Sequence, residues 1–547
     1  MSLTLDGPSA VATAPQPATT APPPTSSHAA PPTSSGSASL KTPVCPPPTS
    51  SGPTTRARSR RDPAIDLVRF ACLVVVVVLH SLMSAAVIGP DGSVVPTVAL
   101  SGTTGFAIAS WLFQIMPLFF VIGGCAGIIS WRRIRAEGGS WGAYLRARLR
   151  RLVVPVTVLI GFTGLGLSVA SGLGAPSELV TEASHRIGQP LWFLAVYVGL
   201  TALVPLAVHF HERAPRRSLA VLTAAVIVVD GLVAVTGVHG LAYVNFVLVW
   251  PLVQQLGFFY ADALDRPVRR LHVWLGLATA LSLLVGLVAA GVCSPNMLVN
   301  LNPPTGALVL LGVVQMCGLR LGHARLSRML NAADENTTTS TGEAALDPRV
   351  LRAQIWGRLI AWGNRYGMHV YLWHMSIVII LIGGLGTLAQ AVSLVPGASG
   401  LVLPEIGSSW WWATRLPWLI VVMVLSGLVA MAAERIPFPS EQRLAAVGRT
   451  IAAIVREMRG REMRGQGSAA SHVDADDVAP AVSRAGADDV TSTLGHPRLR
   501  AAIAVGAATA GIAVALLVGI APLIWTFVAF SLLIASLTMS AGLTPRR

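Results

Sequence analysis

The segment RDPAIDLVRFACLVVVVVLHSLMSAAV, residues 61–87, is the first long apolar run of the chain and decides its class. Arg69 and His80 lie within it, although an ionisable side chain in a membrane helix costs a few kcal/mol and usually faces a cavity or a partner. At about 100° per residue, the step between them is three turns plus about 20°, which puts both side chains on one face roughly 16 Å apart. The pair therefore indicates a functional path along this helix.

The composition agrees with a membrane protein. The 547 residues are 53% hydrophobic and 12% charged, with a mean hydropathy of +0.63, which is too apolar for a soluble globule. We predict an all-α polytopic protein in the lipid bilayer. The net charge of +15 comes from arginines clustered between apolar runs, where they set membrane orientation. Because no separate basic domain is present, we expect no nucleic-acid partner.

Runs long enough to cross about 30 Å of hydrocarbon predict a core of ten helices. They lie near residues 65–87, 106–130, 152–172, 191–210, 218–237, 241–260, 272–292, 304–322, 366–389 and 413–433. The loops 132–151, 211–217 and 262–270 hold seven, three and three arginines, whereas the alternate loops hold at most one. The positive-inside rule then predicts a multi-pass protein of the cell membrane with both termini in the cytoplasm.

Composition divides the chain into four regions. The first is rich in Pro, Ser and Thr and too polar to bury a core, so we expect disorder; the third is a polar, flexible linker. The last is apolar again and predicts a C-terminal hydrophobic hairpin of one or two further helices, serving packing or assembly. The regions are the N-terminal tail (1–62), the ten-helix membrane domain (63–435), the linker (436–498) and the hairpin (499–547).

The cysteines do not predict a metal site or a disulfide framework, because their positions lack the close spacing of ligand sets. They are Cys45, Cys72, Cys125, Cys293 and Cys317. We therefore expect no bound metal.

Five segments in order carry a family resemblance. The first helix has an Arg, ten residues and then a His, preceded by an acid, as Asp66, Arg69 and His80. The other segments are MPLFFVIGGCAGIISWRR (Met116–Arg133), YLRARLRRLVVP (Tyr144–Pro155), PLWFLAVYVGLTALVPL (Pro190–Leu206) and MHVYLWHMSIVI (Met368–Ile379). Over residues 62–435 the chain resembles the acyltransferase 3 family of integral membrane acyltransferases. It departs from the family at Gly123 and Gly124, where Ser-Gly is common.

The resemblance implies an O-acyltransferase that moves an acyl group, which we expect to be acetyl, from acyl-CoA to a hydroxyl of a carbohydrate or glycosylated acceptor. Acyl-CoA is a donor substrate here, and we expect no bound cofactor. The reaction needs a base for the hydroxyl proton and donors for the developing oxyanion. Histidine serves as a base near neutral pH, and the candidates are His80 and His374 of the YLWH segment.

Arginine is the residue suited to the phosphates of CoA, because its guanidinium forms forked, charge-assisted pairs. We therefore place Arg69 in the active site and in donor binding. The other candidates for donor binding are Arg146, Arg148, Arg150 and Arg151. The alternatives are that Arg69 snorkels to the headgroups, that His80 and His374 only join helices, and that the arginine cluster only sets orientation.

Depth estimates make the hypothesis more specific. A helix that starts near residue 65 puts His80 about 22 Å from the cytoplasmic boundary, and one that starts near residue 366 puts His374 about 12 Å from it. We expect acyl-CoA to dock at the inner arginines and extend along the Arg69 face, with His80 serving the transfer beside a cavity open to the outside.

Two functions of other classes compete with this one. A membrane transporter or flippase of a lipid-linked or small acceptor also uses polar residues near the midplane, but no second Arg-to-His helix indicates the matching halves of an inverted repeat. A scaffold without catalysis, built around the tails, is the other. Loss of acyl transfer on substitution of His80 separates the enzyme from both.

Overall fold

The computed structural model describes residues 62–335, 348–450, 453–454, 457 and 497–543. The predicted N-terminal tail up to residue 61 and much of the predicted linker lie outside them. Within the described residues, twelve helical stretches are long and apolar enough to cross a membrane. Ten coincide with the predicted core spans and two form the C-terminal hairpin. The predicted all-α polytopic class is therefore confirmed, and the hairpin contains two helices.

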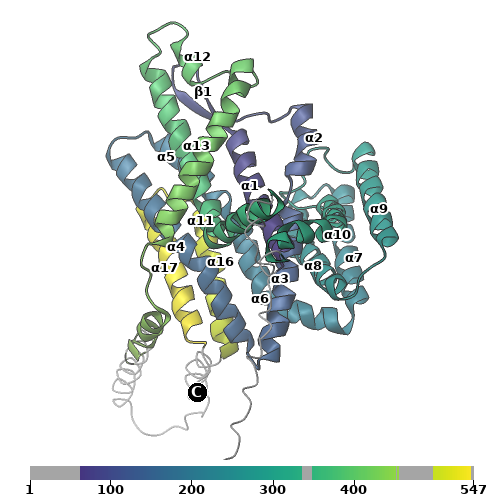
Figure 1. Cartoon of the computed structure of the whole chain (residues 1–547). Helices are drawn as coiled ribbons and strands as arrows, with labels where there is room; N and C mark the ends of the chain where they lie inside the picture. Colours follow the sequence, from purple (N-terminus) through teal and green to yellow (C-terminus); the bar gives the residue numbers. More distant parts are fainter. Residues whose placement is uncertain (1–61, 336–347, 451–452, 455–456, 458–496, 544–547) are drawn as a thin grey trace, which may run out of the picture. The chain divides into compact units, whose positions relative to one another are not determined.

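The elements of the described chain are mostly helices (Figure 1). In order they are α1 (Pro63–Met83), β1 (Ser84–Ile88), β2 (Val94–Val98), α2 (Thr104–Phe113), α3 (Met116–Ala136), α4 (Trp141–Gly172), α5 (Ser177–Gly188), α6 (Leu191–Arg213), α7 (Pro215–Thr236), the 3₁₀ helix η1 (His239–Val247), α8 (Val249–Asp265), α9 (Arg270–Ala289), α10 (Gly306–Glu335), α11 (Pro348–Ala391), α12 (Ala398–Val402), α13 (Ser409–Glu434), α16 (Pro497–Leu517) and α17 (Leu523–Ala541).

The first helix is shorter than the sequence predicts. α1 ends at Met83, and the next residues pair with β2 as an antiparallel hairpin in which Ser84 faces Val98. The turn GPDG allows this, since Gly92 has a φ of +78° and Asp91 accepts hydrogen bonds from the backbone and hydroxyl of Ser93. The prediction of helix to residue 87 was wrong because this turn signal outweighs the apolar run.

α1 and α11 pack closely and run in the same direction. A carbon added at Gly363 would lie 2.3 Å from the ring of Phe70, and one added at Gly367 would lie 3.1 Å from Leu73. Small residues at such spacing let membrane helices approach closely. Both contacts advance toward the C-termini of the two helices. Residues nearer the C-terminal end of α1 therefore meet residues nearer the C-terminal end of α11.

α3 and α8 cross through a second pair of glycines. A carbon added at Gly124 would lie 2.2 Å from the carbonyl oxygen of Gln254, and one added at Gly257 would lie 2.1 Å from that of Val121. Both neighbours are backbone, which cannot move aside as a flexible side chain can. Gly124 therefore serves helix packing. At the neighbouring Gly123, an added carbon would lie 3.0 Å from the ring of Tyr197.

The C-terminal hairpin packs on the core, with α17 against α4 and α16 against α6 (Figure 1). Gly164 of α4 leaves room for Thr526, whose hydroxyl would lie 2.2 Å from an added carbon. The turn of the hairpin is held by Ser184 of α5, whose hydroxyl accepts from the backbone N–H groups of Ile520 and Ala521 at 2.7 and 3.1 Å. The hairpin is thus held by close packing at Gly164 and by hydrogen bonds at its turn.

α7 and α9 are the least buried of the candidate spanning helices that the structure describes, with 6% and 11% of their apolar windows buried within the protein. α7 is nevertheless fixed at one end by Asp230, which accepts from the Asn245 amide at 2.6 Å and from the backbone N–H of Gly306 at 2.8 Å. One carboxylate therefore links α7, η1 and the start of α10.

Gly257→Ala is expected to lower stability by about 1–3 kcal/mol, because the added methyl must separate α3 from α8. Gly199→Ala on α6 is the matched control: no atom lies within 4 Å of its added carbon, so the alanine is tolerated. The apparent melting temperature of the purified chain in detergent checks both. Equal melting temperatures for the two variants would show that the α3–α8 crossing is not tight.

Candidate functional site

The packing of α1 on α11 brings His80 and His374 into contact. The Nδ1 atom of His80 lies 2.8 Å from the Nε2 atom of His374, and the two rings stack with centroids 5.0 Å apart. His374 is fully buried, whereas His80 is partly exposed. The predicted difference in their depths was wrong, because ring nitrogens 2.8 Å apart lie at one depth, and α11 begins at Pro348, well before the predicted start near residue 366. The two candidates therefore form one unit.

The hydrogen bonds assign the protons of the two neutral rings. The Nδ1 atom of His374 lies 2.6 Å from the carbonyl oxygen of Tyr371, which can only accept, so this nitrogen carries a hydrogen. The Nε2 atom of a neutral His374 then has a lone pair and accepts from Nδ1–H of His80. It follows that Nε2 of His80 holds a free lone pair. His80 is thereby presented as a base.

Tyr371 is itself fixed in place. Its hydroxyl donates to the carbonyl oxygen of Pro190 at the start of α6, and its ring meets Phe193 edge-on at 5.6 Å. Phe193 in turn stacks on Tyr197. The carbonyl that orients His374 therefore rests on a packed aromatic cluster between α6 and α11.

Arg69 lies toward the N-terminal end of the same α1 helix. Its guanidinium pairs with Asp66 at 3.0 Å, and the other oxygen of Asp66 accepts from the Asn364 amide of α11, also at 3.0 Å. The Arg69 side chain keeps 32% of its surface exposed. The charge of Arg69 is thus partly balanced by Asp66. The eleven-residue step along α1 separates Arg69 from His80.

The N-terminal end of α1 is capped by Asp62, which lies just before the helix. Its carboxylate accepts from the backbone N–H groups of Ala64 and Ile65 and contacts Nε2 of His323 at 2.7 Å. Burial alone would raise the pKa of Asp62, but His323 and the two N–H groups outweigh it and lower the pKa below 3.8. The carboxylate therefore stays ionised at neutral pH, and its contribution to stability is lost only as pH falls through that lowered value.

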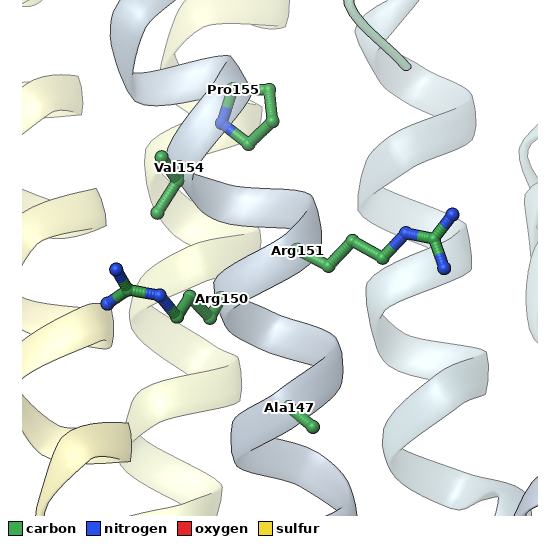
Figure 2. A pocket seen from close by; sticks show the side chains of 5 residues that line it. All are labelled: Ala147, Arg150, Arg151, Val154 and Pro155. Carbon is green, nitrogen blue, oxygen red and sulfur yellow. The ribbon is translucent and has the colours of Figure 1, made fainter. Parts of the chain in front are cut away.

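The predicted arginine cluster on α4 is divided between protein partners and a groove. Arg146 pairs with Glu441 at 3.8 Å, Arg148 lies over the Tyr144 ring at 5.5 Å, and Arg150 donates to a backbone carbonyl at 3.4 Å. Arg150 and Arg151 line an open groove of about 350 Å³. Figure 2 shows the two side chains extending to opposite sides of α4. Arg69 and the α4 arginines therefore have different partners: Arg69 pairs with Asp66 on α1, whereas the α4 arginines contact residues outside α1 or line the groove.

A second buried histidine, His211, has hydrogen-bond partners at both ring nitrogens. His211 of α6 receives a hydrogen bond at Nδ1 from the Gln255 amide at 2.8 Å and contacts Asp262 through Nε2 at 2.9 Å. Asp262 also binds Arg132 at 2.8 Å. Since both ring nitrogens of His211 are occupied, this cluster joins α3, α6 and α8 and offers no free base.

One further charged residue lies within a predicted span and was not among the predicted site residues. Arg415 lies inside the apolar run of α13 and stacks on Trp411, with the guanidinium carbon 4.4 Å from the ring centre. The rule that singled out Arg69 applies equally to it. Among the described residues, no group of three or more His, Cys, Asp or Glu side chains is placed to hold a metal ion.

A family model described as an acyltransferase domain, of the acyltransferase 3 type, matches residues 62–435, from the cap of α1 to the end of α13. The chain belongs to the acyltransferase 3 family. It is therefore a multi-pass membrane acyltransferase, which favours the enzyme over the transporter and scaffold alternatives. α16 and α17 lie beyond the matched residues. No curated protein and no solved structure matched the chain.

The proton assignment predicts that His80 and His374 of this acyltransferase both carry hydrogen on Nδ1, although His211 carries it on Nε2. Solid-state ¹⁵N NMR of histidine-labelled protein in lipid distinguishes these tautomers. His80→Gln and His374→Gln remove single signals and so assign them, and His211 serves as the internal control. A hydrogen on Nε2 of His80 in the neutral state would contradict the assignment.

Proposed function

We propose that this enzyme transfers an acyl group, expected to be acetyl, from acyl-CoA to a hydroxyl of a carbohydrate or glycosylated acceptor. The observation that supports the proposal is the chain of hydrogen bonds from the Tyr371 carbonyl through His374 to His80. This chain leaves a lone pair on Nε2 of His80, which is what activation of a hydroxyl requires. The family assignment supplies the reaction class, and the donor and acceptor are part of the proposal.

The reaction follows from that lone pair. Nε2 of His80 takes the proton of the acceptor hydroxyl as its oxygen attacks the thioester carbonyl. The new C–O bond forms, the C–S bond breaks, and the CoA thiolate takes the proton back from His80. General-base assistance of this kind contributes about 10²–10⁴-fold to rate.

His374 stabilises the positive charge that His80 gains on taking up the proton. Its Nε2 lone pair accepts the hydrogen bond from Nδ1–H of His80. A base oriented by a second group is the arrangement found in nucleophilic triads, here with a histidine and a carbonyl in place of a carboxylate. Two buried donors adjacent in sequence to the histidines have no partner within the described structure: the Ser81 hydroxyl and Nε1–H of Trp373. Both suit the stabilisation of the oxyanion on the thioester.

Arg69 has a different task from His80. The roughly 16 Å between their positions along α1 is too long for both to act on one atom. An extended CoA thioester has comparable length between its phosphates and its acyl group. We therefore assign Arg69 to the donor, with Arg150 and Arg151 of the α4 groove as further candidates for its phosphates.

By the positive-inside rule, the arginine-rich loops favour the cytoplasmic side of the cell membrane for these groups and for both termini. α1 runs from that side outward, so His80 in its last turn lies toward the outer side. Donor and acceptor then approach the histidine pair from opposite ends of α1.

His80→Ala is expected to lower acyl transfer at least 100-fold because it removes the base, while the protein remains folded in the membrane. The measurement is mass spectrometry of acyl groups on cell glycans and metabolites of a deletion strain that expresses the variant. His239→Ala, at the start of η1, is the matched control and should restore wild-type acylation. Restoration by His80→Ala would contradict the assigned base.

A further inference from the structure

Three side chains of α13 stand on successive turns at the outer end of the helix. They are Trp411, Arg415 and Trp418, and α13 begins at Ser409, on the side to which α1 ascends. Arg415 is thus about 9 Å along the helix from its outer end. The steps of four and three residues put the three side chains on one face.

Arg415 is a membrane cation without an anion. Its guanidinium carbon lies 4.4 Å from the ring centre of Trp411 and 5.8 Å from that of Trp418. Its Nε donates to the Trp411 carbonyl and its Nη2 to the Thr414 hydroxyl, both at 3.1 Å. Within the described part of the chain, no carboxylate pairs with Arg415 and its Nη1 makes no hydrogen bond.

The same cluster touches the segment that carries the base. Nε1–H of Trp418 donates to the carbonyl oxygen of Ser81 at 3.1 Å, and Ser81 directly follows His80. β1 begins three residues later at Ser84. The Trp411–Arg415–Trp418 cluster therefore lies beside His80, on the side away from the Arg69 end of α1.

Structural roles alone account poorly for this arrangement. A cation–π contact returns less free energy than a charged side chain loses on leaving water. Arg415 also does not serve the α1 C-terminus, since its acceptors both belong to α13. Arg415 thus keeps its charge without an anionic partner, and its Nη1 has no acceptor among the described residues. We therefore infer that a ligand supplies the anion.

We propose that the Trp411–Arg415–Trp418 cluster is the acceptor subsite, and that it binds an acidic sugar. The guanidinium would hold the anionic group of the glycan, and the partly exposed Trp418 indole would pack against the sugar ring, whereas the buried Trp411 supports Arg415. A neighbouring hydroxyl is thereby directed toward Nε2 of His80. The inference rests on the proposed function for the fate of that hydroxyl, but binding itself does not require acyl transfer.

Binding of methyl glucuronide to the full chain in phosphatidylcholine nanodiscs tests this subsite, with saturation-transfer NMR as the readout. We expect Arg415→Gln to weaken binding at least tenfold and Arg415→Lys, which keeps the charge but loses the fork, to weaken it less. Methyl glucoside, which lacks the carboxylate, should bind weakly and equally to all variants. Arg186→Gln is the matched control, because Arg186 is already paired with Glu182.

Three outcomes would overturn the subsite: no binding of the glucuronide to the wild type, equal binding to wild type and Arg415→Gln, or loss of binding when phosphatidylglycerol is added to the nanodiscs. The last would assign Arg415 to a lipid headgroup. His80→Ala should keep glucuronide binding, so the two proposals fail separately. Binding that depends on Arg415 in a protein without acyl transfer would refute only the proposed function.

Discussion

The hydrogen bond between His80 and His374 depends on how closely α1 and α11 approach each other. Gly363 and Gly367 admit Phe70 and Leu73, and this contact fixes the register in which the two helices ascend the membrane. A shift of one residue would rotate His80 by about 100° away from its partner. The chemistry of the site thus follows from small residues placed two to three turns away from it.

The membrane raises the cost of every polar group, and the described groups meet this cost in two ways. His211 has both nitrogens occupied and joins three helices, and Asp66 binds Arg69 and Asn364 together. His80 keeps one nitrogen unoccupied while the other is held by His374. A partly exposed ring nitrogen without a partner in a membrane helix calls for an explanation, and the proposed catalysis would provide it.

Much of the fold could be predicted from the sequence, because span length, apolar runs and arginine-rich loops follow directly from bilayer physics. Arg69 and His80 could be selected as candidates because ionisable side chains are costly in lipid. The pairing of His80 with His374 was not, since it depends on which helices are neighbours and on where α11 begins. The β-hairpin after Met83 was not predicted because the apolar run continues into it. Arg415 was not singled out because it lies among tryptophans in an otherwise apolar segment.

The central claim is that His374 acts on the reaction only through His80. A double-mutant cycle on kcat, with His80→Ala, His374→Ala and the double variant, tests it most directly. The account predicts that the double variant is no slower than His80→Ala alone, because the relay has no function without its base. Losses that multiply in the double variant would contradict it, since His374 would then act on the reacting atoms independently.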